Sequence, residues 1–124
     1  MKKKGTFLFM GLVFGLVRVF GITTGAGAEN IRIGVASPFT GPLAAYGDNV
    51  KAGVNLKLKE INDAGGINGQ MVELVWGDDL CEPKDAGTVG SKFAADKSIV
   101  AVIGHLCSSA TLAAMPIYVR AGLP

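Results

Sequence analysis

The sequence predicts an α/β fold with a parallel, doubly wound sheet, and three observations support that prediction. Short apolar runs rich in β-branched residues alternate with amphipathic helical patterns from residue 31 onward. The alternation repeats about every 30 residues, which is the size of a strand–helix–strand unit. The run Ile99–Ile103 is apolar at every position, as in a parallel strand covered on both faces. Together these features predict right-handed crossovers with helices on both sides of the sheet.

The N-terminal segment has the pattern of a secretory leader. Three lysines follow the initiator methionine, Thr6–Ile22 is apolar apart from Arg18, and Ala26–Ala28 fits the small-residue pattern of a cleavage site. The alternative is an uncleaved membrane anchor, but a membrane-spanning helix needs about 20 predominantly apolar residues and this run is shorter and charged. We therefore predict a signal peptide over residues 1–28 and a mature chain of residues 29–124.

The charge balance changes once this leader is set aside. The chain has 12 basic and 10 acidic residues, and four of the basic residues, with none of the acidic ones, lie in residues 1–28. Eight basic and ten acidic residues remain, so the mature chain carries a net charge of −2. No basic patch of the kind that binds nucleic acid is left. These numbers predict an exported, mildly acidic protein that does not bind nucleic acid.

The first half of the mature chain predicts one strand and one long helix. Ile31–Ser37 is a strand, and Pro38–Asp48 is a loop because it holds two prolines and two glycines. A helix is expected from about Ala45 to Ala64, where the sequence "AGG" ends it. Its two faces are an apolar one, with Val50, Val54, Leu58 and Ile61, and a solvated one, with Lys51, Asn55, Lys59 and Asn62.

The second half predicts two more strands and two more helices. Met71–Trp76 is a strand with Trp76 in the core, and Pro83 starts a helix that runs to about Asp96. The inner face of this helix is expected to hold Ala86, Val89, Phe93 and Ala94. The apolar strand over residues 99–103 follows, then a helix from about Ser109 to Ala121, and Gly122–Pro124 is expected to turn toward a fourth strand.

The segment Gly104–Ser109, "GHLCSS", lies where such a fold binds ligands. A parallel sheet opens its crevice at the carboxyl ends of its strands, beside the point where strand order reverses. With strand order 2-1-3, the loops after the first and third strands flank that point. Ser108, Ser109 and Thr111 then start a helix, whose unpaired N–H groups and dipole favour an anion. The alternative is that Ser108 or Ser109 only caps the helix.

Tyr46 precedes a loop glycine near the same crevice. It is a candidate for the wall of an apolar pocket. The alternative is a residue that only packs at the start of the helix.

The two cysteines, Cys81 and Cys107, both follow predicted strands. Export favours a disulfide between them, which requires their Cα atoms to lie within about 7 Å. The alternative is a pair of free, buried thiols.

A metal site made from these cysteines, His105, Asp78 and Asp79 matches no compact zinc spacing. Nucleophilic catalysis by Cys107 with His105 lacks a visible orienting partner. We therefore expect no metal, no cofactor and no enzyme activity, and a partly buried His105 that forms hydrogen bonds near the strand end.

The residues also carry a family resemblance. The stretch from "IRIGVASPFTGPLAAYGDNV" to "VIGHLCSSAT" resembles the opening of periplasmic leucine/isoleucine/valine-binding proteins, the substrate-binding components of ABC importers. "TGPLAAYGD", "INDAGGING", "DDLCEPK" and "GHLCSS" occur in the family's order and spacing, from about Ile31 to the end of the chain. The resemblance implies a Rossmann-like lobe of a type I periplasmic binding protein that is incomplete in this chain, with the second lobe absent.

The resemblance also implies a ligand and its binding residues. Ser108 would bind the α-carboxylate of a branched-chain amino acid through its hydroxyl and backbone N–H, while Tyr46, Leu106 and Cys107 would border the side-chain pocket. Cys81 and Cys107 would form a disulfide. The family's remaining ligand-binding groups would lie beyond Pro124. The full-length protein would be a monomer that closes on its ligand by a hinge motion and delivers it to a membrane permease.

Three other interpretations remain open from the sequence. The same fold serves as a sensor domain that binds an amide or another amino acid. An exported enzyme would use Cys107 as its nucleophile. A truncated fragment would have no activity of its own.

Overall fold

The computed structural model describes residues 29–124, and the predicted signal peptide over residues 1–28 lies outside the described part of the chain. Strands and helices alternate strictly along these residues, as predicted. Their bounds are β1 Ile31–Ser37, α1 Ala44–Asp63, β2 Val72–Asp78, α2 Pro83–Ala95, β3 Ile99–Ile103 and α3 Ser108–Ala121.

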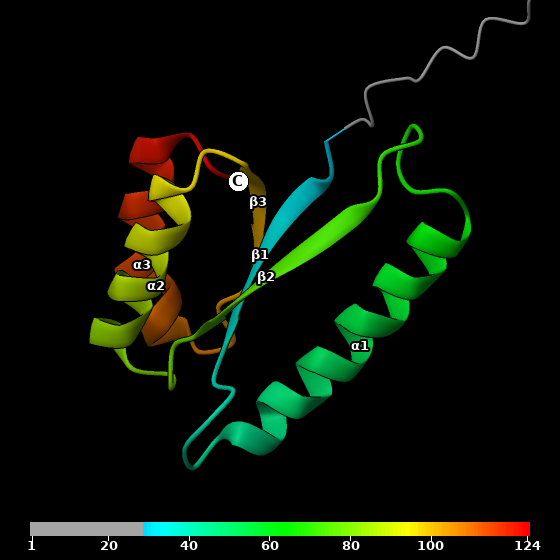
Figure 1. Cartoon of the computed structure of the whole chain (residues 1–124). Helices are drawn as coiled ribbons and strands as arrows, with labels where there is room; N and C mark the ends of the chain where they lie inside the picture. The colour runs from blue at the N-terminus through cyan, green and yellow to red at the C-terminus, as the bar shows by residue number, and fades with distance from the viewer. Residues whose placement is uncertain (1–28) are drawn as a thin grey trace, which may run out of the picture.

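The strands form one parallel sheet in the order β2-β1-β3, which confirms the predicted topology. The chain crosses from β1 to β2 in one direction and from β2 to β3 in the other. Right-handed crossovers in opposite directions place their helices on opposite faces of the sheet. Figure 1 shows this arrangement, with α1 on one side and α2 and α3 together on the other. This is the doubly wound α/β architecture.

The core lies between the sheet and the α2–α3 layer. Phe93 is fully buried there and packs with Ala36, Val89 and Ile99. The predicted inner face of α2 is thereby confirmed for its three buried residues, and Ala94 is half-buried. The apolar face of α1 is only half-buried and borders a groove of about 210 Å³, lined by Ile33, Gly53, Val54, Lys57, Leu58, Ile61, Val72, Leu74 and Ile103.

Two predictions about the strands are wrong for the described residues. β3 lies at an edge of the sheet, with Val100 54% and Ile103 44% exposed, although its apolar sequence predicts cover on both faces. A continuous apolar run indicates that both faces of a strand become buried. It does not indicate which segment of the protein buries them. The Val102 N–H donates to the Pro124 carbonyl (2.8 Å), so the segment after α3 returns to this edge.

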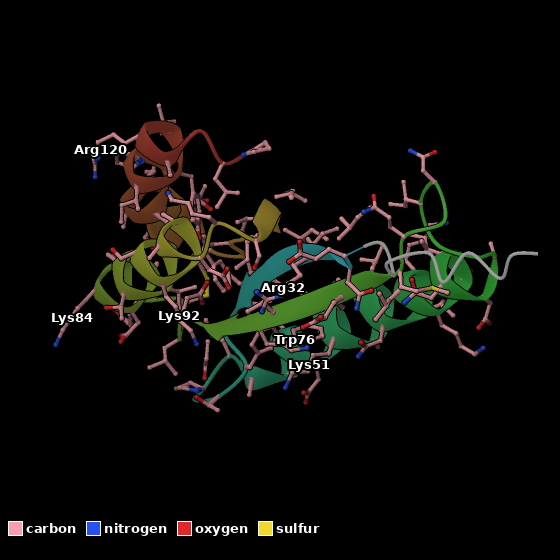
Figure 2. All side chains as sticks on the ribbon, turned by 45° about the horizontal axis from the view of Figure 1, so that its top comes forward. Arg32, Lys51, Trp76, Lys84, Lys92 and Arg120 are labelled. Carbon is pink, nitrogen blue, oxygen red and sulfur yellow. A yellow bond between two sulfur atoms is a disulfide. The ribbon has the colours of Figure 1, made fainter. Side chains whose placement is uncertain are left out.

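Trp76 is half-buried rather than in the core, because β2 forms the other edge of the sheet. Its ring meets Phe39 edge to face, with the ring centres 5.3 Å apart. Lys51 Nζ lies 4.6 Å from the centre of the Phe39 ring. Trp76 and Lys51 border the same open hollow beside β2 and α1. Figure 2 labels both side chains. The edge of the sheet is thus covered in part by an aromatic pair and a lysine.

Asn62 has a structural role that its predicted place on the solvated face of the helix does not indicate. Its Oδ1 accepts the Val72 N–H (2.8 Å) and its Nδ2 donates to the Val72 carbonyl (2.9 Å). These two backbone groups belong to an edge strand, where outward-facing groups have no strand partner. Asn62 therefore satisfies the hydrogen-bonding groups of the backbone at the start of β2 and fixes the C-terminal end of α1 against that strand.

The start of α1 packs closely on the loop after β1 at Gly47, and this contact gives a first prediction. Gly47 is buried, and a Cβ there would meet the Pro38 carbonyl group and lie 3.1 Å from the Phe39 Cα. Alanine favours a helix over glycine by about 1 kcal/mol, but overpacking typically costs about 1–3 kcal/mol. We expect Gly47→Ala to lower the free energy of unfolding by up to about 2 kcal/mol in urea titrations.

Gly53→Ala is the matched control for this prediction, because nothing lies within 4 Å of a Cβ at Gly53 in the same helix. It should raise stability by up to about 1 kcal/mol. Equal stabilisation by both variants would contradict the close contact at Gly47.

Candidate functional site

The candidate site is an apolar hollow between the loops that follow β1 and β3. β1 is the central strand, so these two loops flank the point at which strand order reverses. Tyr46 from the first turn of α1 and Leu106 and Cys107 from the second loop line a hollow of about 270 Å³. Tyr46 is 59% and Leu106 46% exposed, so their side chains form open walls. The structure thus brings together three of the four residues predicted for ligand binding.

Leu43 is the fourth residue of this hollow, and the sequence analysis missed it. It occupies the N-cap position of α1, and its carbonyl accepts the Tyr46 N–H (3.0 Å). Residues three apart share one side of a helix. An apolar residue three positions before Tyr46 is the signal that would have identified it.

Ser108, the other predicted binding residue, is the first residue of α3 and follows Cys107 directly. Cys107 is the N-cap, with extended backbone and no side-chain capping hydrogen bond. Because Ser108 and Ser109 lie inside the helix, the interpretation that one of them is only its cap is wrong. The first-turn N–H groups of a helix have no carbonyl partner within it and carry partial positive charge. Beside the apolar hollow, the structure therefore presents N–H donors and an exposed serine.

The loop before α3 is tied back to the helix by Thr111. Its N–H donates to the Cys107 carbonyl (2.9 Å), and its hydroxyl lies within hydrogen-bonding distance of the carbonyls of His105 (3.2 Å) and Cys107 (3.1 Å). The backbone from His105 to Cys107 is thus held at both of its ends.

Cys81 and Cys107 form a disulfide, with their Cα atoms 5.4 Å apart. The bond joins the loop after β2 to the loop after β3, so these loops lean together across the end of β1. The pair of free thiols weighed as an alternative is not what the structure contains. A thiol nucleophile at Cys107 would require this bond to be broken.

Asp78 joins the loop after β1 to the loop after β2. Its Oδ1 accepts the N–H groups of Phe39 (2.9 Å) and Leu80 (3.2 Å), and its Oδ2 accepts the Thr40 hydroxyl (2.5 Å). Burial alone would raise the pKa of this carboxyl. The hydrogen bonds from Thr40, Leu80 and Phe39 outweigh burial and hold the pKa of Asp78 below its ordinary value of 3.8.

This lowered pKa predicts a defined pH dependence. A carboxyl with a depressed folded-state pKa contributes stability above its unfolded pKa and loses that contribution as pH falls through the folded value. Asp78→Asn should therefore be less stable than the unmodified protein at pH 7, and the difference should shrink as pH falls below about 4. Urea titrations between pH 2.5 and 7 measure this, and a difference that is constant with pH would contradict it.

His105 is buried and lies between two other polar side chains. Its Nδ1 is 2.6 Å from Asp79 Oδ2, and its Nε2 is 3.0 Å from the Tyr118 hydroxyl. The expected hydrogen bonds near the strand end are confirmed, and the histidine is buried where the sequence predicts only partial burial. Within residues 29–124, no three His, Cys, Asp or Glu side chains come together in a way that could hold a metal ion.

Comparison with known proteins identifies the family. The model of the periplasmic binding protein family matches residues 30–124, which is nearly all of the described chain. The chain belongs to the periplasmic binding protein family. A periplasmic location follows for members of this family. None of the helices between residues 29 and 124 is long and apolar enough to cross a bilayer.

The curated relatives include leucine/isoleucine/valine-binding proteins. The chain is 40% identical over 116 residues to Leu/Ile/Val-binding protein homolog 1 of Brucella abortus, an alignment that covers 94% of this chain and 30% of that protein. It is 41% identical to the leucine-, isoleucine-, valine-, threonine- and alanine-binding protein of Pseudomonas aeruginosa, over 98% of this chain and 32% of that one. The chain thus spans about a third of the length of these relatives.

Solved structures show the same fold. The branched-chain amino acid transporter substrate-binding protein LivJ from Streptococcus pneumoniae, in complex with isoleucine, is 38% identical with a TM-score of 0.72, over 77% of this chain and 27% of that one. An ABC transporter substrate-binding protein from Desulfitobacterium hafniense in complex with Leu is 39% identical with a TM-score of 0.64, over the same shares. The fold is therefore part of a lobe of a type I periplasmic binding protein.

Proposed function

We propose that this chain forms the ligand-binding part of the first lobe of a receptor for branched-chain amino acids that serves an ABC importer. The observation that carries the proposal is the apolar hollow of Leu43, Tyr46, Leu106 and Cys107 directly beside the first turn of α3. Relatives in the same family are named for leucine, isoleucine and valine, and a structural neighbour contains isoleucine.

In this proposal, each half of the site receives one part of the ligand. The hydroxyl and backbone N–H of Ser108 receive the α-carboxylate, because a helix N-terminus favours an anion. The aliphatic side chain packs against Leu106 and Tyr46, which offer exposed apolar surface. These walls suit a hydrocarbon side chain better than an amide, which would lose its hydrogen bonds to water.

The remaining parts of the proposal concern the whole receptor. Residues 1–28 are removed as a signal peptide, and the disulfide suits the oxidising periplasm. The receptor is not an enzyme, needs no cofactor or metal, binds no nucleic acid and is a monomer when full length. A second lobe supplies further contacts, and ligand binding favours the closed state because the ligand touches both lobes. The closed receptor then docks on a membrane permease.

Saturation-transfer NMR with L-leucine tests the proposal, since this method detects weak binding to one lobe. The expected result is a saturable signal for L-leucine that L-isoleucine and L-valine reduce by competition, and that D-leucine and L-glutamine leave unchanged. The intact mass of the same sample shows whether the chain starts at Glu29. A folded protein that gives no signal with any of the three branched-chain amino acids would contradict the proposal for this chain.

A further inference from the structure

A buried chain of polar side chains lies beside the proposed site, and the proposed function assigns it no role. Asp79 follows β2, His105 follows β3, and Tyr118 lies in the last turn of α3. Asp79 is fully buried, His105 is 8% exposed and Tyr118 is half-buried. Because buried polar groups are costly unless they are paired, a paired set that connects three elements fixes their relative positions.

The Asp79 carboxylate binds both loops that meet at the disulfide. Its Oδ1 accepts the Cys81 N–H (2.9 Å), and its Oδ2 lies 2.6 Å from His105 Nδ1. Asp79 is two residues before Cys81, and His105 is two residues before Cys107. A disulfide alone leaves its two loops free to rotate about the bond. A second attachment two residues away on each loop removes that freedom.

The imidazole of His105 is held from its other side by Tyr118. The Tyr118 hydroxyl is 3.0 Å from Nε2, and the two rings are stacked with centres 5.9 Å apart. Burial, together with the negative charge of Asp79, raises the pKa of Tyr118 to about 12, so the hydroxyl keeps its proton at neutral pH. The ring therefore has a hydrogen-bonding partner at each nitrogen, and it cannot turn without losing one of them.

His105 directly precedes the residues of the proposed site, so its side-chain contacts also fix the backbone of that site. Its backbone carbonyl accepts the Thr111 hydroxyl (3.2 Å), and the next three residues are Leu106, Cys107 and Ser108. Two of these line the hollow, and the third starts α3. We propose that His105, held between Asp79 and Tyr118, is a positioning residue that sets the backbone of Leu106–Ser108 for ligand binding.

Backbone amide hydrogen exchange across residues 106–111, measured by NMR, tests this positioning without any ligand. We expect His105→Gln to speed exchange in this loop at least tenfold, and Tyr118→Phe to speed it less. His105→Asn, whose amide nitrogen can replace Nδ1 toward Asp79, should restore part of the protection. Val72→Ala is the matched control, because Val72 is buried at the amino end of β2, the end of the sheet opposite to this loop. If the histidine and tyrosine variants speed exchange in the loop only as much as this control does, the inference is wrong.

The ligand part of the inference rests on the proposed function and has its own readout. His105→Gln should weaken L-leucine binding at least tenfold, whereas Val72→Ala should leave the affinity of the folded protein unchanged. Faster loop exchange in a protein that never binds leucine would support the positioning role and overturn the proposed function. Leucine binding that His105→Gln and Tyr118→Phe both leave unchanged would overturn the inference and support the proposed function.

Discussion

Replacing both cysteines of the Cys81–Cys107 disulfide with alanine should lower the free energy of unfolding by about 3.5 kcal/mol. The bond links residues 26 positions apart, and closing a loop of that length restricts the unfolded chain. For a domain of this size the loss corresponds to a fall in Tm of about 15–25 °C. Thermal and urea unfolding of the two proteins, followed by circular dichroism, measures it.

Reduction of the unmodified protein by a thiol provides the control, because it breaks the same bond and keeps both cysteine side chains. It should destabilise the protein by about as much as the double substitution. A loss below about 1 kcal/mol in both experiments would contradict the account in which the bond stabilises the protein mainly by restricting the unfolded chain.

Replacing Ser108 with alanine should weaken L-leucine binding by about 10- to 100-fold. A hydrogen bond to a charged group is worth about 1.5–3 kcal/mol, and each 1.4 kcal/mol changes affinity tenfold. The fold should be unaffected, because Ser108 is exposed and does not cap the helix. The dissociation constants come from NMR titrations of the two proteins.

Ser109→Ala is the matched control for this prediction. Ser109 is also exposed and lies in the same first turn, next to Ser108. It should change leucine affinity less than threefold. If Ser109→Ala weakens binding more than Ser108→Ala does, the carboxylate is held by a different group at this helix end.

The order of the elements, the strand order and the faces of α2 follow from local patterns, which explains why the sequence predicts them well. Apolar periodicity distinguishes the helix face of Val89 and Phe93 from the strand over residues 99–103. Right-handed crossovers then leave few arrangements for a short β-α-β-α-β chain. The place of Cys81 and Cys107 at two strand ends also follows, since the carboxyl ends of parallel strands meet at one edge of the sheet.

The features that the sequence does not predict depend on contacts between distant segments. Asn62 looks like any solvated helix residue, yet it binds the edge of β2 at Val72. Trp76 is a large apolar residue of the kind found in protein cores, but it is half-buried because it lies on an edge strand. The apolar periodicity of a sequence predicts which residues tend to be buried. Only the tertiary structure shows which of them are buried.

The site is partly predictable for the same reason. Ser108, Leu106 and Cys107 follow a strand directly, so topology places them at the crevice. Leu43 was missed because its role depends on how the loop after β1 turns into α1.

The most direct test of the central claim is an amide ¹H–¹⁵N correlation spectrum of the protein titrated with L-leucine. If the hollow beside α3 binds the ligand, the saturable shifts will cluster at Leu43, Tyr46, Leu106, Cys107 and Ser108, with weaker changes in the rest of the first turn of α3. Saturable shifts that cluster instead along the groove under α1, or no shifts from a folded protein at high leucine concentration, would contradict a branched-chain amino acid site at this end of the sheet.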